Sequence, residues 1–126
     1  MRRWMIFGAT AATVAFAGTT VAATSAPAAT RGDVISFSVA SATSWGTISY
    51  YNGVNILRQQ HDFALTEKGP DGLYRRTITF PSSVPRQILG LRMQSEGDTA
   101  QCQISVNGKV RSRGVAHGFR SSALCS

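Results

Sequence analysis

The side chains that could do acid–base or nucleophilic chemistry in this 126-residue chain are few. His61 stands beside Asp62, and His117 lies in the stretch VAHGFRSS, close to several serines. A Ser–His–Asp site could be assembled in space from such residues. However, the sequence has no GxSxG elbow, no HExxH motif and no carboxylate pair in a recognisable frame. The six acidic residues are scattered in turns. We therefore expect a protein that is not an enzyme and that uses no cofactor and no metal.

The two cysteines, Cys102 and Cys125, form the second chemically interesting pair. A redox or metal pair is the alternative to a disulfide, but CxxC spacing is absent and only two histidines are available. In an exported protein an even number of cysteines indicates a disulfide. A bridge across this separation would be worth about 3 kcal/mol, because it restricts the unfolded chain.

The third feature is a set of cations at every second position in the stretch CQISVNGKVRSRG, which reads as a β-hairpin around Asn107-Gly108. A two-residue turn would place these cations on the apolar face of Ile104 and Val106, which burial disfavours. A three-residue loop with a left-handed Gly108 in a bulge would instead pair Ile104 with Val110 and turn the cations outward. We predict the bulged loop and an outward basic stripe. Its members are Lys109, Arg111 and Arg113. The stripe is either a solvated face or a surface that binds an acidic partner.

The first 28 residues differ in composition from the rest. Arg2 and Arg3 are followed by no further charge until Arg31, and the stretch between them is apolar or small. A basic start, an apolar centre and small residues near the cleavage site are typical of a signal peptide. The alternative is an uncleaved membrane segment, because Trp4–Ala23 reaches the roughly 20 residues that a span needs. We predict either of these for residues 1–28, and one exported domain for residues 29–126.

Strand patterns dominate the remaining residues. VISFSV alternates apolar and polar residues, and GTISYY is a second such run that ends at Asn52-Gly53. The stretch 54–65 suggests a weak strand followed by an apolar anchor at Phe63 and Leu65. Further strands are expected at 73–80, at 87–95 and in the hairpin. Six or seven short strands with turns at each join predict an all-β sandwich or small barrel.

The net charge of the chain is +7, and it stays positive when Arg2 and Arg3 are removed with a signal peptide. A basic exported protein can bind anionic lipid headgroups, acidic wall polymers or an acidic protein face. The sequence has no recognition helix and no aromatic-rich basic motif, so we do not expect it to bind nucleic acid.

The C-terminal stretch CQISVNGKVRSRGVAHGFRSSALC resembles the signature of the MmpS family (mycobacterial membrane protein, small). That signature has a cysteine, an Ile-x-Val-Asp/Asn-Gly motif and a second cysteine about twenty residues later. GTISYYN is similar to the aromatic strand of the family, and MQSEGDTAQC to its polar approach to the first cysteine. The resemblance extends over residues 34–126 and is strongest at the C-terminal end.

The resemblance implies an immunoglobulin-like β-sandwich of about seven strands, with Cys102–Cys125 as its disulfide, in the cell envelope of an actinobacterium. It also implies a role as an accessory protein of RND-type lipid or siderophore exporters, on the outer side of the cytoplasmic membrane. The family usually has a firm membrane helix and a longer tether than residues 24–33 provide here. A freely secreted binding module for a ligand, the cell wall or a protein, with no exporter of its own, is therefore the alternative function.

Overall fold

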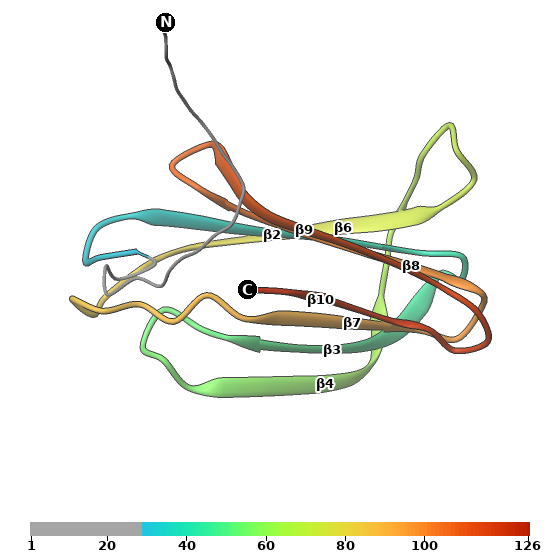
Figure 1. The fold of residues 1–126 in the computed structure, drawn as a ribbon, viewed down its shortest axis with the longest axis horizontal. Coiled ribbons are helices and arrows are strands. Elements are labelled where there is room, and N and C mark those ends of the chain that lie inside the picture. Colours follow the sequence, from blue (N-terminus) through green and yellow to red (C-terminus); the bar gives the residue numbers. More distant parts are fainter. Residues whose placement is uncertain (1–28) are drawn as a thin grey trace, which may run out of the picture.

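The computed structural model describes residues 29–126, which form two antiparallel β-sheets packed face to face (Figure 1). The predicted all-β sandwich with one disulfide is confirmed, with nine strands rather than about seven. The strands are β2 (Val34–Ser41), β3 (Trp45–Tyr51), β4 (Leu57–Ala64), β5 (Glu67–Lys68), β6 (Tyr74–Pro81), β7 (Leu91–Ser95), β8 (Thr99–Val106), β9 (Lys109–His117) and β10 (Ser122–Cys125). The predicted signal peptide or membrane segment, residues 1–28, lies outside the described residues. Within residues 29–126 no helix is long and apolar enough to cross a bilayer.

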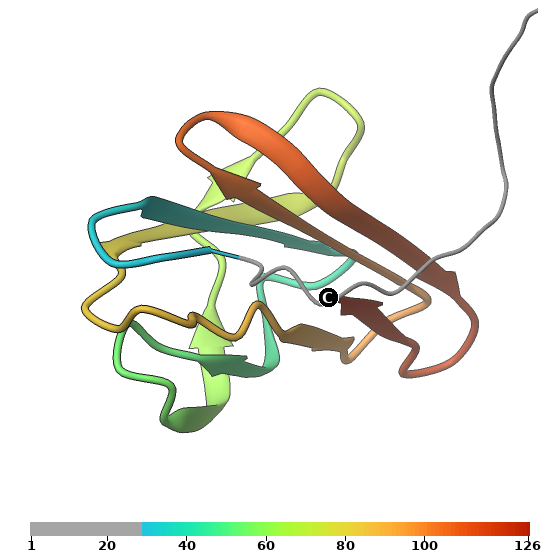
Figure 2. The same cartoon turned by 60° about the vertical axis from the view of Figure 1, so that its left-hand side comes forward.

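The central strand pairs agree with those of an immunoglobulin-like sandwich. One sheet has the order β10-β7-β3-β4, and the other has the order β5-β6-β2-β8-β9. The central pairs, β2 with β6 and β3 with β7, lie in the two facing sheets as strands B–E and C–F do in immunoglobulin domains. The β8–β9 hairpin extends the larger sheet beside β2, and β10 then returns to the smaller sheet beside β7 (Figure 2).

The core follows from the alternation that the sequence shows. Every second residue of β8 is buried, from Ala100 to Val106, and β2 buries Ile35, Phe37 and Val39 against it. Ile48 and Met93 fill the core from the facing sheet. Each such side chain contributes about 1.5–3 kcal/mol when it leaves water. The predicted anchor after β4 is confirmed, because Phe63 and Leu65 are both buried.

The predicted register of the β8–β9 hairpin is wrong. The turn has two residues, Asn107 and Gly108, and Val106 pairs with Lys109. Both turn residues have positive φ, 52° and 82°, as a type I′ turn requires. Ile104 pairs with Ser112 and not with Val110, because the register shifts at Arg111.

Asn107 is the physical reason for this turn. Its backbone N–H donates to the Val34 carbonyl at 2.8 Å, and its side-chain oxygen accepts from the Val34 N–H at 2.8 Å. Its side-chain nitrogen donates to Asp33 Oδ1 at 3.0 Å. A two-residue turn alone would place the cations of β9 on the apolar face of the hairpin. This is avoided further along β9, where the register shifts by one residue at Arg111. Beyond this bulge the cation Arg113 faces outward and small residues face the core.

Candidate functional site: a polar groove beside the basic hairpin

The outer face of the larger sheet carries a groove of about 420 Å³. It crosses strands β6, β2, β8 and β9, and β5 contributes to one rim. The lining side chains are mostly uncharged and polar or small, with an arginine toward each side. They are Ser38, Val39, Ala40, Glu67, Arg75, Thr77, Gln101, Cys102, Gln103, Arg113, Gly114 and Val115.

The floor of the groove is a cross-strand row of polar side chains. Ser38 of β2 pairs with Thr77 of β6 on one side and with Gln103 of β8 on the other. The Ser38 and Thr77 hydroxyls are 3.1 Å apart. Arg113 of β9 is the register partner of Gln103, and its Nε donates to Gln103 Oε1 at 3.0 Å. This row therefore offers hydroxyl, amide and guanidinium groups in one line.

The second arginine of the groove is Arg75 of β6. It pairs in register with Glu67, while its guanidinium forms an ion pair with Asp71. The neighbouring Arg76 points to the other face, where its guanidinium lies 4.6 Å from the centre of the Phe63 ring. The alternation along this strand thus allows only one of the two adjacent arginines to reach the groove.

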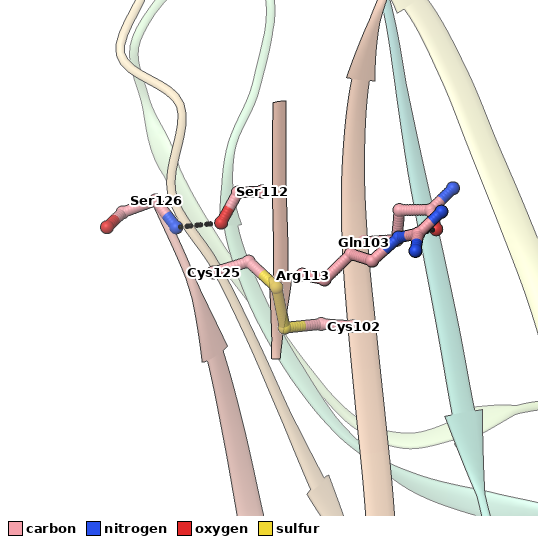
Figure 3. The surroundings of a disulfide bond; sticks show 6 residues. All are labelled: Cys102, Gln103, Ser112, Arg113, Cys125 and Ser126. Carbon is pink, nitrogen blue, oxygen red and sulfur yellow. Dashed lines mark hydrogen bonds between the residues drawn. A yellow bond between two sulfur atoms is a disulfide. The ribbon is translucent and has the colours of Figure 1, made fainter. Parts of the chain in front are cut away.

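The disulfide lies under the β9 side of the groove (Figure 3). Cys102 of β8 and Cys125 of β10 have Cα atoms 6.2 Å apart, so the bridge joins the two sheets. Gly114, the register partner of Cys102, lets β10 approach β9: a Cβ there would lie 2.4 Å from the Leu124 carbonyl oxygen. Ser126 N–H also donates to Ser112 Oγ at 3.1 Å. The C-terminal strand is therefore fixed directly beneath the groove.

The three cations of the predicted basic stripe are all exposed, but they do not form one row. Arg113 lies on the outer face beside Gln103. Lys109 pairs with Val106 at the end of the hairpin, and Arg111 occupies the bulge. The bulge thus interrupts the period-two alternation on which the predicted stripe depends.

Arg111 lies close to the domain's N-terminal turn. A hydrogen bond from the Thr30 backbone N–H, assisted by one from the Asn107 amide and by the charge of Arg111, holds the pKa of Asp33 below its ordinary value. The carboxylate of Asp33 therefore ties the start of β2 to the β8–β9 turn.

The two histidines contact threonines in different sheets. His61 Nδ1 lies 3.3 Å from the Thr47 hydroxyl in the smaller sheet. His117 Nδ1 lies 3.4 Å from the Thr99 hydroxyl in the larger sheet. Within the described part of the chain, no three metal-ligating side chains are close enough to hold an ion. The groove, by contrast, brings together donors and acceptors that could bind a polar ligand with an anionic group.

Sequence reasoning missed most of this groove. Ser38, Gln101 and Arg75 come from strands that are distant in the sequence, and only their alternation with buried residues marks them as outward-facing.

A scan against models of known protein families and a search of curated proteins found no match for this chain.

Proposed function

We propose that this chain is an exported, non-catalytic β-sandwich that acts by binding, as an accessory protein of an RND-type lipid or siderophore exporter in the actinobacterial cell envelope. The observation that carries the proposal is the disulfide between β8 and β10. It joins the two cysteines of the stretch that resembles the MmpS signature, and disulfides persist in oxidising compartments outside the cytoplasm.

The binding surface in this proposal is the groove together with the exposed cations beside it. Arg113 supplies positive charge on the outer face of the larger sheet, and Lys109 and Arg111 extend it toward the hairpin tip, whereas the charge of Arg75 is paired with Asp71. Guanidinium groups form strong paired hydrogen bonds with carboxylates and phosphates. An acidic face of an exporter or an anionic envelope surface would complement them.

The alternative function is a freely secreted binding module with no exporter of its own. The groove favours it in one respect, because a volume of about 420 Å³ is within the range of small-molecule sites. Retention of residues 1–28 separates the two functions, since an accessory protein must stay at the membrane.

The test begins with the intact mass of the protein recovered after export. A retained N-terminal segment, together with co-purification of a large membrane exporter, would support the accessory role. A mass that starts near residue 24 or 29, with no exporter recovered, would support the secreted module. A protein recovered only from the cytoplasm, with both cysteines reduced, would contradict both functions.

In the same co-purification, Arg113→Glu is the variant that tests the groove. Its matched control is Arg120→Glu, because Arg120 is equally a surface cation but lies at the β9–β10 turn in an ion pair with Glu96. We expect Arg113→Glu to weaken recovery of the partner and Arg120→Glu to leave it unchanged. Equal recovery with both variants would rule out the groove as the binding surface.

A further inference from the structure

The antiparallel pairing collects the turns of the described chain at two opposite ends of the sandwich. At one end β2, β4, β7 and β9 begin and β3, β6 and β8 finish (Figure 1, left). Hydrogen bonds join the loops there: Gln87 Nε2 donates to the Asn52 carbonyl at 2.8 Å, and Ser83 N–H donates to the Gly53 carbonyl at 2.8 Å. Six cations lie at this end, which we call the basic end. They are Arg31, Arg58, Arg86, Arg92, Lys109 and Arg111.

The acidic residues gather at the opposite end. Five of the six lie there, in or beside the turns that connect β4 to β6 and β7 to β8. They are Asp62, Glu67, Asp71, Glu96 and Asp98. The Gly118 N–H donates to the Asp98 carbonyl at 2.9 Å, so the β9–β10 turn belongs to this end as well. Asp33 is the one acid at the basic end, and its carboxylate accepts hydrogen bonds from Thr30 and Asn107.

The arginines of the smaller sheet and its loops are not neutralised within residues 29–126. The salt bridges in this part of the chain, Arg75–Asp71 and Arg120–Glu96, both lie at the opposite end. Arg58, Arg86 and Arg92 form none among the described residues. Arg92 donates instead to the Ser122 hydroxyl at 3.3 Å.

The basic end also exposes aliphatic side chains. Ile56 is 54% exposed, Leu57 57%, Val54 49% and Ile88 45%. Asn55 joins the two loops that carry them, because its Oδ1 accepts from the Ile88 N–H at 2.8 Å and its Nδ2 donates to the Arg86 carbonyl at 2.8 Å. Exposed aliphatic residues on fixed loops mark an interaction surface rather than a loose segment.

We propose that the basic end docks onto an anionic lipid bilayer, with Val54, Ile56 and Ile88 entering the interfacial layer and Arg58, Arg86 and Arg92 meeting headgroup phosphates. Aliphatic residues flanked by arginines are the composition that binds such an interface. The position of Ala29 supports the same orientation. Ala29 pairs with Gln87 at the basic end, and residues 1–28 are joined to the domain through it. The proposal rests on the proposed function only in requiring a compartment where such a surface faces the protein.

The experiment measures sedimentation of the exported protein with phosphatidylcholine vesicles, with and without phosphatidylglycerol. Wild type should bind the anionic vesicles and lose most of that binding at high salt, because the attraction is screened. Arg86→Glu should weaken the partition coefficient at least about fivefold, the effect of one cation near such a surface. Ile56→Ser combined with Ile88→Ser should weaken binding even where salt has removed the electrostatic part.

Matched controls lie at the opposite end. Lys68→Glu makes the same charge change as Arg86→Glu, and Phe119→Ser removes a side chain that is 88% exposed. Both controls should bind vesicles as wild type does. Equal loss in a control and its partner variant would overturn the proposal, as would equal binding to neutral vesicles. Absence of wild-type binding would also overturn it and leave an acidic protein as the occupant, without affecting the export and disulfide tests above.

Discussion

The disulfide between the sheets gives the most quantitative prediction. β10 is an edge strand of four residues, held by its ladder with β7 and by the bridge from Cys125 to Cys102 of the facing sheet. Replacing both cysteines, as Cys102→Ala combined with Cys125→Ala, removes the bridge without leaving a lone thiol. Alanine is preferred to serine because both positions are buried and a hydroxyl there would be desolvated.

The expected loss follows from the length of the closed loop. For the sequence separation of 23 residues, the chain-entropy relation gives about 3 kcal/mol. A domain of this size shifts its melting temperature by roughly 4–8 °C per kcal/mol. The double variant should therefore melt about 12–24 °C below wild type, and the two smaller side chains should add to this loss through a cavity.

Thermal unfolding followed by circular dichroism measures the shift, and hydrogen exchange locates it. Exchange should rise first in β10 and in the half of β9 that faces it, around Gly114, while β2 stays protected at the centre of its sheet. Reduced wild type should show the same loss without the contribution of the cavity. A melting temperature within a degree or two of oxidised wild type, or exchange that rises equally in β2, would refute this account of the bridge.

Three further predictions use single substitutions. Gly114→Ala should lower the melting temperature measurably, because its Cβ would lie 2.4 Å from the Leu124 backbone oxygen and overpacking typically costs 1–3 kcal/mol. His61→Ala and His117→Ala should leave partner binding, measured by co-purification, unchanged, since each ring lies beside a threonine hydroxyl of a neighbouring strand and outside the groove. Asp33→Asn should lower the melting temperature at neutral pH but not in acid: the folded pKa of Asp33 is depressed, so its stabilisation is present above the ordinary carboxyl pKa and is lost as the pH falls below about 4.

The strands could be predicted where alternation and burial agree. β3 and β6 lie within a residue of their predicted ranges, and β2 continues two residues beyond its predicted end, because each alternates inward and outward residues. The predicted strand at 87–95 is half irregular, since β7 begins only at Leu91. Gln87 is buried there through hydrogen bonds to Asn52, Asn55 and Ser82. The local sequence pattern could not show this burial, because Asn52 and Asn55 belong to the turn between β3 and β4.

The hairpin register depended on a contact that is distant in the sequence. Arg113 faces outward, as expected from the cost of burying a charge. A bulge could turn it outward from either of two places, the loop or β9 itself. The hydrogen bond from Val34 N–H to Asn107 Oδ1, across 73 residues, favours the two-residue turn and leaves the bulge to Arg111. The choice between two local solutions was therefore made by tertiary structure.

The same reasoning explains why the net charge of the chain could be read from the sequence, whereas the arrangement of the charged side chains on the surface could not. Arg58, Arg86 and Lys109 are far apart in the sequence, yet each lies within a few residues of a turn at the same end of the sandwich. Antiparallel strands reverse direction at every turn, so residues beside alternate turns gather in space while those beside the intervening turns gather opposite. Five of the six acids lie beside the intervening turns. The charges are separated along the sandwich because cations lie beside one set of turns and most acids beside the other. This separation can be recognised only when the pairing of the strands is known.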